Sequence, residues 1–96
     1  MSAYVIVDID VQDPAGYEEY KKLAPASIAA FGGRYIARGG QTHVLEGDWR
    51  PNRIVILEFD TVDQAQAWVT SEEYAPARKL RQATARASMI VVAGVD

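Results

Sequence analysis

Apolar residues recur along the chain at two spacings, one typical of strands and the other of helices. Residues 4–11 alternate between two sets of side chains, as in a strand that is buried on one face. The more apolar set is Val5, Val7, Ile9 and Val11. Residues 53–59 alternate in the same way, and their buried set is Val55, Leu57 and Phe59. Residues 88–95 are apolar on both faces, which predicts a strand that is covered on both sides.

Spacings of three and four residues between these strands predict helices. The first helix is expected to begin at Pro14, with Asp13 as its N-cap, and to end near Phe31 before two glycines. Pro25 lies inside this helix and removes a hydrogen-bond donor, so we expect a kink or a break into two shorter helices there. A second helix is predicted to follow Asp60 as its N-cap, and a further helical stretch extends to about residue 85.

A second glycine pair separates the first helix from the strand at residues 53–59. Residues 34–38, Gly39-Gly40 and residues 42–49 are together predicted to form one strand that is bent or bulged at its glycines. Residues 50–52 have the sequence Arg-Pro-Asn, which predicts the turn of a hairpin.

The predicted elements follow the order strand, helix, strand, strand, helix, strand over a single domain of residues 1–96. This is the ferredoxin-like α+β arrangement, βαββαβ, with a four-stranded antiparallel sheet. Helices cover one face of such a sheet, and the other face presents an apolar set: Tyr4, Ile6, Ile54 and Ile56. A patch of this kind is too large for a stable monomer. We therefore expect a homodimer in which two sheets pack face to face.

Composition narrows the classes of function. The 96 residues contain no cysteine, which excludes disulfides, zinc–thiolate sites, iron–sulfur sites and thiol catalysis. The only histidine and the scattered carboxylates form no metal pattern, so we expect neither a metal nor a cofactor. The formal net charge of -3 argues against nucleic-acid binding. No apolar run is long enough for a membrane span and no secretion signal is visible, so we expect a cytoplasmic protein.

Several short motifs occur in an order that resembles a known family. They are Arg38-Gly39-Gly40, Glu46 to Pro51, Glu58-Phe59, Trp68, Ser71 to Tyr74, and Leu80-Arg81. The set resembles the bacterial family called domain of unknown function 1330, a member of the dimeric α/β-barrel superfamily, over nearly the whole chain. The resemblance implies a ferredoxin-like protomer that pairs sheet to sheet into a dimeric α/β barrel. It implies no single reaction, because the superfamily includes cofactor-free monooxygenases, isomerases, haem-handling proteins and binding modules.

The candidates for proton transfer are Glu58, His43 and Asp8. Glu58 lies on a predicted apolar sheet face, where desolvation would raise its pKa, and Asp8 lies on the corresponding face of the first strand. Two such carboxylates can act as acid and base toward an enolisable substrate. The alternative for Glu58 is an ordinary ion pair with Arg38 or Arg53. His43 is either a catalytic base or a surface or dimer-contact residue.

The candidates for ligand binding are arginines and aromatic residues: Tyr17, Arg38, Trp49, Tyr74, Arg78 and Arg81. If the last helix is continuous, Tyr74, Arg78 and Arg81 share one face, so a guanidinium beside a phenol can hold a carboxylate. The alternative is that these arginines are solvated or pair with acidic residues.

Three functions remain open. The first is a dimeric protein that binds a small anionic or polar-aromatic metabolite in a cleft between helices and sheet. The second is a cofactor-independent enzyme, resembling a monooxygenase or an isomerase, that uses Glu58 or His43 for proton transfer. The third is a structural or accessory dimer without a ligand, whose apolar face serves only dimerisation.

Overall fold

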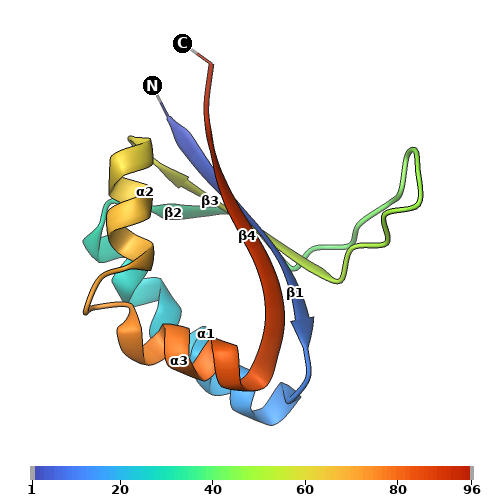
Figure 1. The fold of residues 1–96 in the computed structure, drawn as a ribbon, viewed down its shortest axis with the longest axis horizontal. Helices are drawn as coiled ribbons and strands as arrows, with labels where there is room; N and C mark the ends of the chain where they lie inside the picture. Colours follow the sequence, from blue (N-terminus) through green and yellow to red (C-terminus); the bar gives the residue numbers. More distant parts are fainter. Residues whose placement is uncertain (1, 96) are drawn as a thin grey trace.

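The computed structural model describes residues 2–95, which form one antiparallel sheet with three helices on one of its faces (Figure 1). The elements are, in chain order, β1 (Ala3–Val11), α1 (Pro14–Ala30), β2 (Arg34–Arg38), β3 (Arg53–Phe59), α2 (Val62–Val69), α3 (Ala75–Thr84) and β4 (Ala85–Ala93). The strands are ordered β2-β3-β1-β4, and every neighbouring pair is antiparallel. This is the predicted ferredoxin-like topology, in which two helices, α2 and α3, connect β3 to β4.

The helix-covered face of the sheet carries the alternating apolar sets that the sequence predicts. Val5 of β1 lies opposite Leu57 of β3 and Val91 of β4, and Val5 and Leu57 are both buried. Trp68 of α2 and Tyr74 are buried under this face, with ring centroids 4.2 Å apart. Burial of large apolar side chains contributes about 1.5–3 kcal/mol each, and it holds the helices on the sheet.

The opposite face of the sheet is open in the single chain. The predicted apolar set points there and is only partly buried: Tyr4, Ile6, Ile54 and Ile56. β4 adds Ile90 and Val92 beside them, with 59% and 46% of their surface exposed. Within one chain the last strand is covered on one side only, and the cover predicted for its other side would have to come from a partner. The strand begins at Ala85 rather than at residue 88. An apolar face of this kind needs another surface to cover it.

The helix α1 begins as the sequence predicts but is not broken. The Asp13 Oδ1 atom accepts a hydrogen bond from the backbone N–H of Gly16 at 3.2 Å, so Asp13 is the N-cap. The predicted break at Pro25 is wrong, because one helix continues through this residue. Pro25 has no N–H to donate, which frees the carbonyl oxygen of Lys21 four residues earlier.

The strand predicted at residues 42–49 is not formed. β2 ends at Arg38, Gly39 turns the backbone with a φ of 68°, and residues 39–52 form a long loop that extends away from the sheet (Figure 1). The predicted turn at residues 50–52 is only the last part of this connection. Asp8 of β1 holds that part, because Oδ1 accepts from the Asn52 N–H at 2.9 Å and Oδ2 from the Trp49 indole N–H at 3.1 Å.

Two further local features lie a short distance from their predicted positions. The irregularity in the pairing of β2 with β3 falls between Tyr35 and Ala37, ahead of the glycine pair. The N-cap of α2 is Thr61 rather than Asp60, because Thr61 is extended and its Oγ1 accepts the Gln64 N–H at 3.0 Å. Shifts of this size leave the topology unchanged.

Candidate functional site

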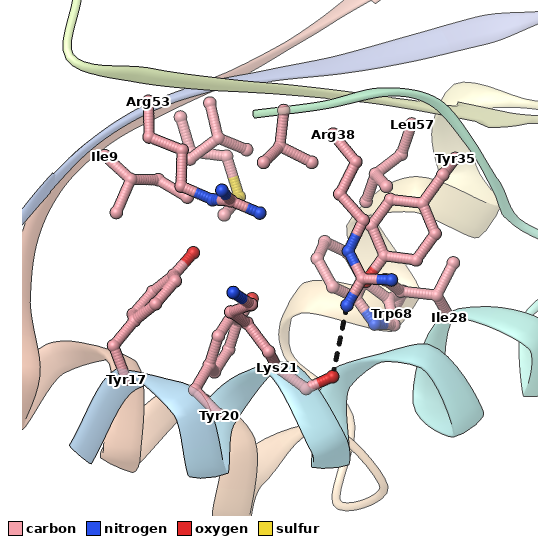
Figure 2. Close-up of a pocket in the computed structure, with 13 residues that line it drawn as sticks. Ile9, Tyr17, Tyr20, Lys21, Ile28, Tyr35, Arg38, Arg53, Leu57 and Trp68 are labelled. Atoms are coloured by element: carbon pink, nitrogen blue, oxygen red, sulfur yellow. Dashed lines mark hydrogen bonds between the residues drawn. The ribbon is translucent and has the colours of Figure 1, made fainter. Parts of the chain in front are cut away.

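A cleft lies between α1 and the helix-covered face of the sheet (Figure 2). Its polar wall combines three tyrosines with three cationic side chains: Tyr17, Tyr20, Lys21, Tyr35, Arg38 and Arg53. Its apolar floor comes from the sheet and from α1 and α2: Val7, Ile9, Ile28, Val55, Leu57, Trp68 and Met89. No acidic side chain of residues 2–95 lines it, so the cleft is a positively charged site with aromatic walls.

Arg38 is held at the mouth of the cleft by two contacts. Its guanidinium carbon lies 4.5 Å from the centroid of the Tyr35 ring, which is a cation–π arrangement. Its Nη2 atom donates a hydrogen bond to the carbonyl oxygen of Lys21 at 3.2 Å, drawn as a dashed line in Figure 2. That carbonyl is the one freed by Pro25, so the proline inside α1 supplies the acceptor that orients Arg38.

Arg53 extends over the cleft from the first position of β3. Its guanidinium carbon lies 5.8 Å from the centroid of the Tyr17 ring, and the hydroxyl of Tyr17 points toward it (Figure 2). The Nε atom of Arg53 is buried and has no hydrogen-bond partner within residues 2–95. A Cβ atom at Gly39 would overlap this guanidinium, so glycine at that position leaves room for Arg53.

Neither cleft arginine is neutralised by an acid. The ion pairs among the described residues include neither Arg38 nor Arg53: Lys21–Glu18, Lys22–Glu19 and Arg34–Glu58. A guanidinium stays protonated at physiological pH. Two positive charges therefore border a partly desolvated space, and such a space attracts an anion.

The tyrosine hydroxyls of the cleft are neutral at physiological pH. Burial raises the pKa of Tyr17, although the Arg53 guanidinium opposes this shift. Burial raises the pKa of Tyr20 far above its usual value, and Tyr74 adds to the shift. The hydroxyl oxygens of Tyr20 and Tyr74 lie 2.9 Å apart, and Arg81 Nε donates to the Tyr74 oxygen at 3.3 Å. Neutral phenols donate hydrogen bonds to an anion and are poor proton acceptors.

The cleft is narrow while its side chains stand in these positions. About 20 Å³ is free for the centre of a water molecule, which is room for about one water. Lys21 is half-buried at the rim, and its flexible side chain can move toward solvent. A molecule larger than water would fit only where this side chain moves aside, while Arg38, Arg53 and the aromatic rings keep their places in the wall.

The ligand-binding residues predicted from the sequence lie in different parts of the molecule. Tyr17 and Arg38 line the cleft. Tyr74 is fully buried beneath it, with its hydroxyl on that of Tyr20. Trp49 belongs to the long loop and lines a groove on the open face of the sheet. Of the predicted set, Tyr17 and Arg38 thus line the cleft, whereas Trp49 does not.

Arg78 and Arg81 line a different cavity, next to β4. Arg81 meets Tyr74 through its Nε atom, as their seven-residue spacing on one helical face predicts. Arg78 does not join this contact, because its Nη1 atom donates to the Val69 carbonyl at 2.7 Å. The predicted trio therefore divides into one tyrosine–arginine pair and one helix-connecting arginine.

Glu58 is partly buried, but hydrogen bonds to its carboxylate outweigh the effect of burial on its pKa. Hydrogen bonds from Ser2 and Arg34 lower its pKa, whereas the sequence predicted a raised value. Arg34 Nε donates to Glu58 Oε1 at 2.6 Å across the β2–β3 pair. The ion-pair alternative therefore describes Glu58, but its partner is Arg34 rather than Arg38 or Arg53.

The predicted pair of acid and base is not assembled. Glu58 lies opposite Tyr4 of β1, whereas Asp8 lies four residues farther along that strand, opposite Ile54. Both carboxylate oxygens of Asp8 hold the long loop. His43 is exposed in the same loop and lines the groove on the open face. None of the three candidates for proton transfer therefore lines the cleft.

The sequence candidates omit four polar residues of the cleft: Tyr20, Lys21, Tyr35 and Arg53. The position of Arg53 was informative, because it begins the alternating set that continues with Val55 and Leu57. A charged residue on the buried face of a strand points into the space between sheet and helices. Lys21 and Tyr35 follow no comparable pattern, since their roles depend on contacts across the fold.

Other kinds of site have less support in the described part of the chain. Residues 2–95 contain no group of three or more histidine or carboxylate side chains that could hold a metal ion. Over the same range, no helix has both the length and the apolar character needed to cross a bilayer. The donors that line the cleft are cations and phenols, which suit an anion.

One protein-family model covers nearly the whole chain. It is described as a domain of unknown function (DUF1330), and it matches residues 2–95. The chain belongs to the DUF1330 family. This match confirms the resemblance seen in the sequence motifs. No curated protein matches the sequence.

Solved structures share the fold of this DUF1330 protein at low sequence identity. A protein of unknown function from Rhodopseudomonas palustris has a TM-score of 0.78 and 18% identity, over 99% of this chain and 83% of that one. SnoaB, a cofactor-independent oxygenase from Streptomyces nogalater, has a TM-score of 0.68 and 13% identity, over 99% and 94%. A dimeric protein of unknown function and ferredoxin-like fold from Bacteroides fragilis has a TM-score of 0.61 and 18% identity, over 95% of this chain and 94% of that one. These likenesses confirm the ferredoxin-like fold.

Proposed function

We propose that this DUF1330 protein binds a small organic anion, in particular a polar-aromatic carboxylate, in the cleft between α1 and the sheet. The observation that carries the proposal is the Arg53 guanidinium, whose buried Nε has no hydrogen-bond partner within residues 2–95. A buried donor without an acceptor costs about 1–3 kcal/mol. An anionic oxygen in the cleft would remove this cost and neutralise one of the two unpaired arginines.

The shape of the wall supports an aromatic ligand. Arg38 lies over the ring of Tyr35 and Arg53 over the ring of Tyr17, so cations and aromatic faces alternate around the cleft. A carboxylate accepts two parallel N–H bonds from one guanidinium. A planar ring attached to it can pack against the neighbouring tyrosines, and a phenol or carbonyl on that ring can bond to a tyrosine hydroxyl.

Thermal unfolding with a matched pair of compounds tests the cleft. Para-hydroxybenzoate carries the ring, the phenol and the carboxylate, and its methyl ester keeps the ring and the phenol but has no charged group. We expect the acid to raise Tm in a saturable way and the ester to have little effect. Arg53→Gln and Arg38→Gln should each weaken the apparent affinity about tenfold or more. Arg86→Gln, an exposed arginine of β4, is the control for the loss of one positive charge. Equal stabilisation by the ester, or unchanged affinity in the Arg53→Gln protein, contradicts the proposal.

The proposal includes a homodimer formed through the open face of the sheet. Ile90 and Val92 remain 59% and 46% exposed there in the single chain, next to the partly buried isoleucines of β1 and β3. The ferredoxin-like protein from Bacteroides fragilis, which shares this fold, is dimeric. A second copy packed sheet to sheet would bury this apolar surface. The cytoplasmic setting expected from the sequence remains part of the proposal.

A second candidate function is cofactor-independent oxygenation of a ligand in the same cleft, which the likeness to SnoaB favours. Arg38 and Arg53 would stabilise the phenolate or enolate on which such chemistry depends. Oxygen uptake with methoxyhydroquinone, corrected for the rate without protein, tests this function. Oxygen uptake that is lost in Arg53→Gln but retained in His43→Ala and Glu58→Gln supports oxygenation in the cleft. Oxygen uptake that is lost in His43→Ala or in Glu58→Gln favours proton transfer by the residue that was changed. The alternative of an accessory dimer predicts neither binding nor uptake.

A further inference from the structure

A second and larger cavity lies between α2, α3 and β4. About 530 Å³ of it is free for the centre of a water molecule, compared with about 20 Å³ in the cleft. Trp68 and Met89 line both spaces, so these two side chains form the wall between them. The cavity is therefore a separate site with its own set of polar groups.

Arg81 of α3 places a buried positive charge at this cavity. Only 8% of its surface is exposed, and it forms no ion pair within residues 2–95. Its Nε atom donates to the hydroxyl oxygen of Tyr74 at 3.3 Å, and a phenol is not a counter-ion. Burial of a guanidinium without a counter-ion is unfavourable, because the group cannot lose its proton. The surroundings of Arg81 thus lack an anion.

A second arginine reinforces the charge. Arg78 lies about one helical turn before Arg81, lines the same cavity, and is fixed by a hydrogen bond from Nη1 to the Val69 carbonyl at 2.7 Å. No acidic side chain of the described residues lines the cavity. The cavity therefore combines two cations without an opposing negative charge.

The other residues that line the cavity indicate what kind of ligand it suits apart from its charged group. The apolar side chains come from the sheet and from α2: Val5, Trp68, Val69, Met89 and Val91. The polar side chains besides the arginines are Gln66, Thr70 and Gln82. We infer that this cavity binds a monocarboxylic acid with an apolar body, whose carboxylate lies on Arg81 and whose body packs against Trp68 and β4.

The inference goes beyond the proposed function of the cleft and is tested with a different probe. Phenylbutyrate joins a carboxylate to an apolar body, and phenylbutanol is its uncharged match. In ¹H–¹⁵N NMR titrations, phenylbutyrate should shift the amide signals of Gln66, Gln82 and Val91 in a saturable way. The affinity for phenylbutanol should be lower than that for phenylbutyrate by a factor of about ten or more. Arg81→Gln should weaken phenylbutyrate binding about ten- to hundredfold, whereas Arg53→Gln in the cleft should leave it unchanged.

A second variant covers the case in which the Arg81→Gln protein does not fold. Gln66 is exposed and lines the cavity, so Gln66→Trp should obstruct it without disturbing the core. Phenylbutyrate binding that is unchanged in a folded Arg81→Gln or Gln66→Trp protein overturns the inference. Loss of this binding in the Arg53→Gln protein overturns it too. Equal affinity for phenylbutanol, or no saturation below about 10 mM, overturns it as well. Failure of para-hydroxybenzoate to bind in the cleft would leave these outcomes unaffected, so the two proposals are tested separately.

Discussion

Pro25 determines where Arg38 points, although the two residues belong to different elements. The proline has no backbone N–H, so the carbonyl of Lys21 lacks its helical donor, and the guanidinium of Arg38 donates to that carbonyl at 3.2 Å. The same guanidinium lies over the ring of Tyr35. A missing bond inside α1 thus orients one of the two cleft arginines.

We expect Pro25→Ala to stabilise α1 and to release Arg38. The alanine N–H would donate to the Lys21 carbonyl, which should raise the free energy of unfolding by about 1–3 kcal/mol in urea denaturation. Affinity for para-hydroxybenzoate should fall, because the alanine N–H competes with Arg38 for the Lys21 carbonyl oxygen. Pro76→Ala is the matched control, since Pro76 lies in the first turn of α3, where no helical donor is required. A Pro25→Ala protein that gains no more stability than this control contradicts the relationship.

The hydrogen-bonded carboxylate of Glu58 predicts a pH dependence of stability. Its pKa in the folded protein lies below its usual value of 4.5, because Ser2 and Arg34 bond to the charged form. Such a group stabilises the fold above its unfolded pKa, and the contribution is lost as pH falls through the folded pKa. When the pH is lowered from neutral to below 4.5, the urea concentration at the midpoint of unfolding should therefore fall more steeply in the wild type than in Glu58→Gln. Glu46→Gln, in the exposed loop, should follow the wild type. Parallel curves for the Glu58 variant and the wild type would rule out this contribution.

The buried hydroxyl of Tyr74 should matter more for stability than that of Tyr20. Tyr74→Phe removes the polar partner of the buried Arg81 guanidinium, and we expect it to cost about 2–3 kcal/mol. Tyr20→Phe removes only the hydrogen bond between the two phenols and should cost about 1 kcal/mol. Urea denaturation of both variants gives the comparison. Equal losses would mean that Arg81 does not depend on Tyr74.

A charge on the open face of the sheet should dissociate the proposed homodimer. Ile90 lies opposite Ile6 on that face, and Ile90→Glu would place an unpaired carboxylate in the sheet-to-sheet interface. Light scattering after size exclusion should then give the mass of one chain instead of two. Leu23→Glu is the control, because Leu23 is 47% exposed on α1, on the other side of the sheet. A wild-type protein with the mass of one chain refutes the dimer, and an Ile90→Glu protein that stays dimeric refutes this interface.

The elements that the sequence predicts correctly have local determinants. Alternation identifies β1 and β3, and the pair Asp13-Pro14 identifies the start of α1. Residues 42–49 also resemble a strand, but a strand forms only where a neighbouring strand offers free hydrogen-bonding groups. Gly39 turns the chain away from β3, and this turn decides the outcome.

The site was harder to predict because it depends on contacts between distant segments. The environment of Glu58 is set by Arg34 across a strand pair, and that of Arg38 by a carbonyl of α1. Neither partner can be chosen from spacing along the chain, since Arg38 and Arg53 both lie nearer to Glu58 in sequence than Arg34 does. Arg53 is the exception, because its place in the alternating set of β3 assigns it to the buried face.

The way in which Asp8 holds the long loop bears on how the chain tolerates changes of length. One end of the loop is fixed where the Gly39 N–H donates to the Ile54 carbonyl at 2.8 Å. The other end is fixed where Trp49 and Asn52 donate to the Asp8 carboxylate. Residues 40–48 lie between these two points and are exposed throughout. Because doubling a flexible loop costs only about 0.6 kcal/mol of closure entropy, a peptide tag or a reporter can be inserted there while the sheet keeps its register.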